Sequence, residues 1–199
     1  MSEREVMKRI YANNLQSGGA SLRGVAADLD VPEAEVGGTV SILKDSGLVK
    51  GTESRLEITE EGRQSLKVVF IGGAFEVIHA GHLYTIEKAK GLGDFLVVVV
   101  ARDITVRKRK KRDPVAPETE RVRVVAGLKK VDAAILGSET NIYETLEKVK
   151  PDIVALGYDQ YHGEEEISRE AKKRGLTLTV VRLDSPFPGI KTSKIIAEL

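Results

Sequence analysis

The sequence of 199 residues contains no cysteine. A chain without cysteine has no disulfide framework, no thiolate zinc site and no cysteine nucleophile. Long apolar runs are missing too. The longest, residues 95–101 (FLVVVVA), has the length of a strand and falls far short of the roughly 20 residues that a membrane helix needs. The first residues (MSEREVMKRI) are charged, which argues against a signal peptide. We therefore expect a cytoplasmic protein with no membrane contact.

Charge is balanced over the whole chain but is unevenly distributed. Hydrophobic residues make up 41% and charged residues 31% of the sequence, a composition that excludes a disordered or low-complexity protein. Residues 1–66 carry 8 basic and 11 acidic side chains, whereas the rest of the chain has a basic excess. This excess is concentrated in residues 107–112 (RKRKKR). A basic run of this kind usually binds phosphate, either on a nucleic acid or on a nucleotide.

Residues 1–66 have the pattern of a small helical domain that ends in a β-hairpin. A helix is predicted from residue 3 to 16, a second is capped by Ser21, and a third begins at Pro32. Two short strands follow at 48–50 and 55–58. This order, with the phrase LKDSGLVKG…LEITEEGRQSL, resembles a winged helix-turn-helix domain.

The presumed recognition helix of this domain (PEAEVGGTVSILKD) is acidic at its front, whereas contacts to DNA phosphates require Lys and Arg. We therefore expect the first domain to mediate self-association, giving a homodimer, or to regulate the second domain. DNA binding is the disfavoured alternative.

Residues 67–199 alternate between strand and helix. Strands are predicted at 67–71, 95–101, 133–136, 153–156 and 176–182, and helices at 79–90, 117–129, 142–149, 165–174 and from 192. The β-branched run 95–101 is typical of a strand buried on both faces of a parallel sheet. The pattern predicts an α/β domain with a five-stranded, parallel, doubly wound sheet of the Rossmann-like kind. Its ligand should lie beyond the carboxyl ends of the strands, at the switch point.

The first strand of this domain is followed by the motif GGAFEVIHAGH (72–82), which has neither the glycine spacing of a dinucleotide fingerprint nor that of a P-loop. His79 and His82 are three residues apart, so they face the same way at a helix start, beside free backbone N–H groups. Gly81 leaves room for a phosphate to approach. This arrangement suits charge stabilisation on a phosphate in transit. A zinc site would need two further ligands, for which only His162 and carboxylates are available, so we expect no protein-bound metal.

The stretch Gly73-Ala74-Phe75-Glu76-x-x-His79-x-Gly81-His82 resembles the G-T-F-D-x-x-H-x-G-H signature of the cytidylyltransferase-like nucleotidyltransferase superfamily, whose domain is of the HUP type. Residues 89–106, 117–138 and 150–160 look most like archaeal FAD synthases, which transfer AMP from ATP to FMN. Glycerol-3-phosphate cytidylyltransferases are similar over the same span and provide the alternative.

The chain departs from these families at several positions. Ala74 replaces a threonine and Glu76 replaces an aspartate of the signature. Near Pro186 the sequence lacks an arginine that cytidylyltransferases carry, which favours ATP over CTP as the donor. The cysteines that archaeal FAD synthases often carry near the C-terminus are also absent.

The resemblance implies roles for further residues. Lys110-x-Arg112-x-Pro114, in the loop predicted after the second strand, resembles a K-x-R-x-P motif that contacts phosphates, and Thr192 and Ser193 would donate hydroxyls to the β- and γ-phosphates. The remaining expected nucleotide-binding residues are Gly73, Ala74, Phe75, Gly81, Gly157, Asp159 and Gln160. Asp103 and Arg121 would bind the acceptor substrate. Four of these residues have plainer interpretations: Lys110 and Arg112 as parts of a solvated basic loop, Arg121 as an exposed helical arginine and Thr192 as a helix cap.

The reaction that these expectations describe needs no covalent protein intermediate. A phosphate oxygen of the acceptor attacks the α-phosphorus of a nucleoside triphosphate, and pyrophosphate leaves. Mg²⁺ would arrive with the triphosphate and be held mainly by phosphates and water. A hypothesis from another class is a transcription regulator whose α/β domain only senses a nucleotide or a flavin.

Overall fold

The computed structural model describes residues 1–187, 189–190 and 192–197, and the chain divides into two compact units, Met1–Leu66 and Lys67–Leu199. No helix in the described ranges is long and apolar enough to cross a membrane.

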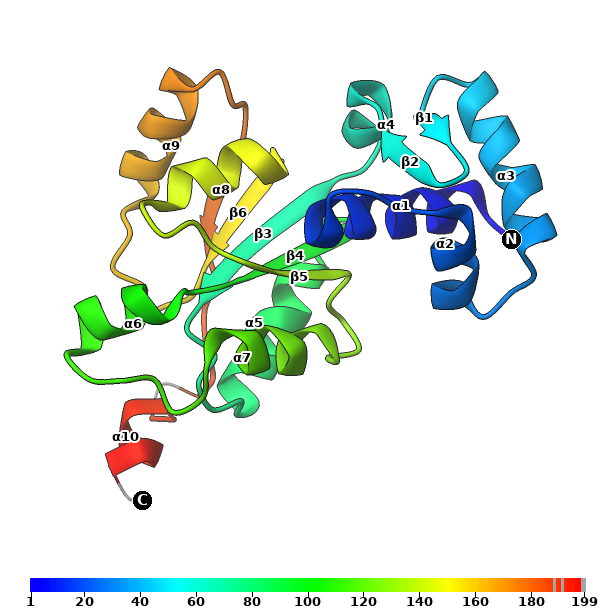
Figure 1. The fold of residues 1–199 in the computed structure, drawn as a ribbon. Helices are drawn as coiled ribbons and strands as arrows, with labels where there is room; N and C mark the ends of the chain where they lie inside the picture. Colours follow the sequence, from blue (N-terminus) through cyan, green and yellow to red (C-terminus); the bar gives the residue numbers. More distant parts are fainter. Residues whose placement is uncertain (188, 191, 198–199) are drawn as a thin grey trace. The chain divides into compact units, whose positions relative to one another are not determined.

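The first unit consists of helices followed by an antiparallel hairpin (Figure 1). Its elements are α1 (Glu3–Ser17), α2 (Leu22–Leu29), α3 (Glu33–Asp45), β1 (Val49–Thr52), β2 (Arg55–Ile58) and α4 (Glu60–Gln64). Ser21 caps α2 by accepting a hydrogen bond from the Gly24 N–H, as the sequence predicts. The short α4 is not predicted, and it begins at Thr59, whose side chain accepts from the Gly62 N–H. That this unit is a winged helix-turn-helix stays a prediction.

The second unit contains a five-stranded parallel sheet with the strand order β5-β4-β3-β6-β7. The strands are β3 (Val68–Gly73), β4 (Phe95–Val100), β5 (Ala133–Leu136), β6 (Ile153–Leu156) and β7 (Thr179–Arg182). The helices are α5 (Ala80–Lys90), α6 (Asp103–Lys110), α7 (Glu118–Ala126), α8 (Ile142–Val149), α9 (Glu164–Lys173) and α10 (Thr192–Ala197). The predicted fold class is confirmed.

Helices cover both faces of the sheet, and β4 is buried between them. Every residue of β4 is buried, as the uninterrupted β-branched run predicts. On one face, Ile86 of α5 and Val125 of α7 pack into the same apolar cluster as Leu96 and Val98 of β4. Figure 1 shows α8 and α9 on the opposite side of the sheet from α5 and α7. The sheet is therefore doubly wound.

The switch point of the sheet lies between β3 and β6, the first and fourth strands of this unit along the chain. The ladder between them consists of the pairs Val69↔Ile153 and Phe70↔Val154, whereas β3 stays paired with β4 as far as Gly73↔Val100. Beyond Phe70, the Gly72 carbonyl accepts a hydrogen bond of 2.6 Å from the side-chain amide of Gln160. The two strands thus part at their carboxyl ends, which leaves space for a ligand.

The basic run differs from its prediction. Residues 107–110, expected in a loop, form the last turn of α6, and Lys111 ends this helix with φ 57°, in the left-handed region. Arg and Lys are good helix formers, and cations at a helix C-terminus interact favourably with the helix dipole. Because these residues are helical, their side chains point in different directions, and only some of the cations can face the sheet.

Candidate active site

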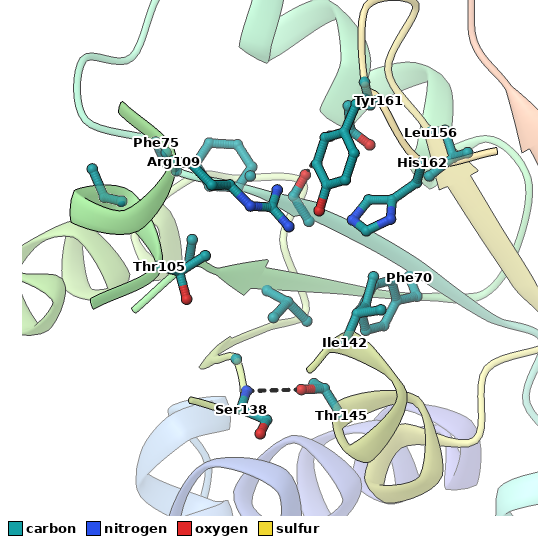
Figure 2. Close-up of a pocket in the computed structure, with 18 of the residues that line it drawn as sticks. Phe70, Phe75, Thr105, Arg109, Ser138, Ile142, Thr145, Leu156, Tyr161 and His162 are labelled. Atoms are coloured by element: carbon teal, nitrogen blue, oxygen red, sulfur yellow. Dashed lines mark hydrogen bonds between the residues drawn. The ribbon is translucent and has the colours of Figure 1, made fainter. Parts of the chain in front are cut away.

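A pocket of about 450 Å³ lies at the carboxyl ends of the strands, where the switch point predicts it (Figure 2). It is lined by residues that follow β3, β4, β5 and β6, and its volume is within the range of small-molecule sites. The expected site residues that line it are Gly73, Ala74, Phe75, His82, Lys110, Asp159, Gln160 and Thr192. The expected residues outside its lining are His79, Gly81, Asp103, Arg112, Arg121, Gly157 and Ser193.

The two motif histidines stack at the start of α5. His79 is the N-cap residue, and its carbonyl accepts hydrogen bonds from the His82 and Leu83 N–H groups. The two imidazole centroids are 3.9 Å apart, and the Nδ1 atom of each ring is buried without a hydrogen-bond partner. Buried polar atoms are seldom left unpaired, so these two nitrogen atoms indicate a binding site for a ligand.

Both imidazoles are neutral at pH 7. The pKa of His82 is lowered to about 4, mainly by burial. The nearby His79 ring also lowers this pKa, and the Asp159 carboxylate raises it by less. Burial also lowers the pKa of His79 below its ordinary value, against an opposing effect of Asp159. A neutral imidazole still offers an N–H donor, so the pair can stabilise developing negative charge through hydrogen bonds.

Two glycines of the motif make room for side chains. A Cβ atom at Gly81 would lie 3.1 Å from Cε1 of His79 and 3.2 Å from its Nδ1 atom. Gly81 therefore leaves room for the His79 ring, and the phosphate contact expected at this glycine stays a prediction. At Gly73, a Cβ would lie 2.9 Å from the Phe75 ring, which packs 5.2 Å from the His82 ring.

The carboxylate of Glu76 is completely buried and is surrounded by donors from the end of α6. It forms ion pairs with Lys110 and Arg112, the latter at 2.7 Å, and accepts a hydrogen bond of 3.3 Å from the Val115 N–H. Burial alone would raise the pKa of Glu76, but hydrogen bonds from Arg112 and Lys110 bring it down to about 2. Lys110 also reaches the pocket, whereas Arg112 does not line it. Arg112 thus forms an internal ion pair outside the pocket lining, and its expected phosphate contact stays a prediction.

Asp103 and Arg121 bind one another instead of lining the pocket. Arg121 is 2% exposed and donates to Asp103 Oδ1 at 2.6 Å. Its other donors reach the carbonyls of Ala74, Ala101 and Ala116, which belong to three separate segments. The plainer interpretation of Arg121 as an exposed arginine is wrong, because its side chain is buried. Its role in binding the acceptor substrate stays a prediction. Through these hydrogen bonds, the buried Arg121 side chain holds the loop after β3 against the end of β4.

The comparisons with known proteins agree with this geometry. A family model described as cytidylyltransferase-like matches residues 70–198. The chain belongs to the cytidylyltransferase-like family. The resemblance seen in its motif is thereby confirmed.

Relatives of this cytidylyltransferase-like chain include two archaeal proteins named FAD synthase. The one from Ferroglobus placidus is 50% identical over 118 residues, which are 59% of this chain and 76% of that protein. The one from Methanothrix thermoacetophila is 47% identical over 126 residues, 63% of this chain and 87% of that protein. A solved structure, the lipopolysaccharide core biosynthesis protein from Thermoplasma volcanium GSS1, is 42% identical with a TM-score of 0.59 and covers 60% of this chain and 98% of its own.

The segment after β6 brings further residues of the cytidylyltransferase-like domain to the pocket. Arg182 of β7 fixes this segment, because its Nη1 donates to the Gly157 and Gln160 carbonyls, both at 3.0 Å. Gly157 therefore contributes a backbone carbonyl that holds this segment, and it does not line the pocket. Asp159 and Gln160 lie in the lining as expected. Of the two hydroxyls expected at the C-terminal helix, Thr192 lines the pocket and Ser193 is exposed outside it.

The lining residues that the sequence analysis missed include Arg109, Tyr161 and His162. Arg109 was hidden within the basic run. Its helical spacing from Thr105, which also faces the pocket, is the signal that would have separated it from its neighbours. Tyr161 and His162 directly follow the expected residue Gln160, so extending that segment by two residues would have found them.

Proposed function

We propose that the chain is an adenylyltransferase that transfers AMP from ATP to FMN, yielding FAD and pyrophosphate. The observation that carries this proposal is its 50% identity to a protein named FAD synthase, over 76% of the length of that protein. The pocket at the switch point, with the histidine pair beside it, is consistent with this assignment.

The reaction is a displacement at phosphorus. A phosphate oxygen of FMN forms a bond to the α-phosphorus of ATP, while the bond from that phosphorus to the pyrophosphate oxygen breaks. No side chain acts as a nucleophile, so catalysis consists of holding the two substrates in line and stabilising charge. His82 faces the pocket as a neutral donor, and His79 stacks on it, so we assign both to the α-phosphate.

The leaving pyrophosphate needs cations and hydroxyls. Lys110 is the cation that lines the pocket close to His82, since its charge is felt in the lowered pKa of that histidine. Thr192 brings a hydroxyl from the first residue of α10. The buried Glu76 carboxylate acts through Lys110 and is thus a positioning residue.

Mg²⁺ fits this site as a companion of the triphosphate. Within the described part of the chain, no group of three or more His, Asp or Glu side chains could hold a metal ion. The pocket lining contains one carboxylate, that of Asp159. Mg²⁺ is usually bound through one or two carboxylates together with substrate phosphates and water, so Asp159 is the residue that would contact it. The ion would neutralise charge on the phosphates.

An activity assay with two donors and two acceptors tests the proposal. Purified protein is incubated with ATP or CTP and with FMN or glycerol 3-phosphate, and both the released pyrophosphate and the nucleotidylated acceptor are measured. We expect FAD from ATP and FMN, with the His82→Ala variant as the matched control for a contaminating enzyme. Formation of CDP-glycerol without any FAD would show that the alternative assignment is correct.

A further inference from the structure

An aromatic and cationic stack crosses the pocket between the segments that follow β4 and β6. The guanidinium carbon of Arg109 lies 4.0 Å from the centre of the Tyr161 ring, and the rings of Tyr161 and His162 are 4.0 Å apart. Figure 2 shows Tyr161 between the other two side chains. We call these three residues the stacked bridge. Because β4 and β6 flank β3 in the sheet, the stacked bridge joins the two sides of the switch point.

The pocket wall that faces the stacked bridge is apolar at its base. Phe70 and Leu156 line it although they are only 1% and 2% exposed, and Ile142 adds a further apolar side chain at the start of α8. In Figure 2, the hydrogen-bonded pair of Ser138 and Thr145 lies across the pocket from the stacked bridge. The space between the stacked bridge and this pair has the side chains of the stacked bridge on one side, apolar side chains along its base and polar groups at its far end.

This environment favours a planar conjugated ring over a phosphate or a small polyol. Burial of apolar surface and stacking against an aromatic ring or a guanidinium both stabilise a flat ring. A polyol would instead lose hydrogen bonds to water at the apolar base and regain few of them. Of the groups suited to phosphates, His82 and Thr192 belong to other elements, α5 and α10, and Lys110 is the last residue of α6, directly after Arg109.

We propose that the ring system of the acceptor binds between the stacked bridge and the apolar base of the pocket. In this arrangement Arg109 and Tyr161 determine specificity, because they select a planar aromatic phosphate ester over a small polyol phosphate. This inference rests on the proposed function and adds to it the residues that would distinguish FMN from glycerol 3-phosphate.

Binding of flavin without ATP provides the decisive measurement, because it requires no turnover. Quenching of flavin fluorescence is titrated with FMN and with riboflavin, which has the same ring but no phosphate. Tyr161→Ala and Arg109→Ala should each weaken binding of both flavins by about 3- to 10-fold, the usual value of one ring contact. Tyr161→Phe keeps the ring and should bind as the unaltered protein does. Tyr161 is 63% exposed, so its removal should leave the fold intact, which the thermal unfolding midpoint checks.

Lys108→Ala is the matched control for Arg109→Ala, because Lys108 is an exposed cation on the same helix that does not line the pocket. It should leave flavin binding unchanged. In steady-state assays, the bridge variants should raise the KM for FMN and leave the KM for ATP within about twofold.

Four results would overturn the inference. Unchanged flavin binding in both alanine variants would show that the stacked bridge does not touch the ring. A raised KM for ATP with unaltered flavin binding would place the adenine, not the acceptor, against Tyr161. A protein that binds no flavin and makes no FAD would refute the proposed function together with the inference. FAD synthesis that is indifferent to the bridge variants would refute the inference alone.

Discussion

The guanidinium of Arg112 donates hydrogen bonds to both oxygens of the Glu76 carboxylate, from Nη1 to Oε1 at 2.7 Å and from Nη2 to Oε2 at 3.2 Å. Glu76 follows β3, and Arg112 follows α6, so this pair joins the segment after β3 to the segment after α6. Lys110 binds the same carboxylate and also reaches the pocket. The buried Glu76 carboxylate therefore fixes the position of the Lys110 ammonium group in the pocket.

Replacement of Glu76 with Gln should destabilise the protein by about 1–3 kcal/mol at pH 7, because two cations lose their charged partner. The pKa of Glu76 is about 2 in the folded chain against an ordinary value of 4.5. The unfolded chain thus takes up this proton first, so the stabilisation is complete above pH 4.5 and is lost as the pH falls towards 2. Urea unfolding at several pH values should show the two proteins converging on acidification.

The control for this prediction is Glu147→Gln. Glu147 is a half-exposed acid, 48% accessible, that pairs with Arg174 at 3.4 Å. Its replacement should cost less than about 1 kcal/mol. Equal losses in the two variants would contradict a special contribution from the buried carboxylate.

Lys110 and Arg112 should differ in their effect on the nucleotide. Lys110→Ala should raise the KM for ATP about tenfold, since a charged hydrogen bond to a phosphate is lost, and this effect should shrink as salt is added. Arg112→Ala should mainly lower stability, because Arg112 contacts Glu76 and does not line the pocket. Steady-state kinetics at two ionic strengths check both statements. An equal rise in KM in both variants would mean that Arg112 leaves Glu76 to bind the triphosphate.

Local patterns sufficed for the sheet and for the position of the pocket. The run Phe95–Val100 can be read from neighbouring residues alone, and an alternation of strands and helices leaves few topologies open. Contacts between distant segments could not be read in this way. Arg121 is buried because carbonyls of Ala74, Ala101 and Ala116 converge on it, and these segments meet only in the folded chain. In the same way, the role of Arg112 depends on Glu76, which lies 36 residues before it.

His82→Ala should lower kcat by about 10²–10³-fold and change the KM for ATP little, because a donor to the transition state is removed. The pKa of His82 is about 4, and that of His79 is also below its ordinary value. Proton uptake by His82 should therefore begin well below pH 6.5. The pH profile of kcat/KM, which reports the free enzyme, should lack a fall near pH 6.5 that is caused by His82. A fall at that pH that disappears in His82→Ala would contradict the lowered pKa.

Gly81→Ala should separate activity from stability. The new Cβ would press on the His79 ring at 3.1 Å and displace it, so kcat should fall about 10- to 100-fold. Stability should hold or rise slightly, because alanine loses less conformational freedom than glycine in a helix. Gly38→Ala is the matched control, since Gly38 lies in α3 with open space around its Cβ position, and it should leave activity unchanged. Full activity in Gly81→Ala would show that the His79 ring need not keep its place.

The first unit offers DNA few free cations. In the hairpin of β1 and β2, Arg55 and Lys50 both face Glu57, at 3.0 and 4.0 Å. Arg63 is 6% exposed and donates to the Leu66 carbonyl. The first turn of α3 is acidic, with Glu33 and Glu35. A strong non-specific interaction with DNA needs a basic face, so we propose that this unit mediates self-association or regulation.

A fragment from Lys67 onward should therefore fold alone and keep its adenylyltransferase activity within about twofold, because the pocket residues all belong to the second unit. Its oligomeric state, measured by light scattering, should differ from that of the full chain if the first unit mediates self-association. In gel-shift titrations at physiological salt, the full chain should bind its own upstream DNA no more tightly than about 1 µM, the limit of non-specific binding. Tighter, sequence-selective binding that responds to flavin or nucleotide would instead make the first unit a DNA-binding regulator.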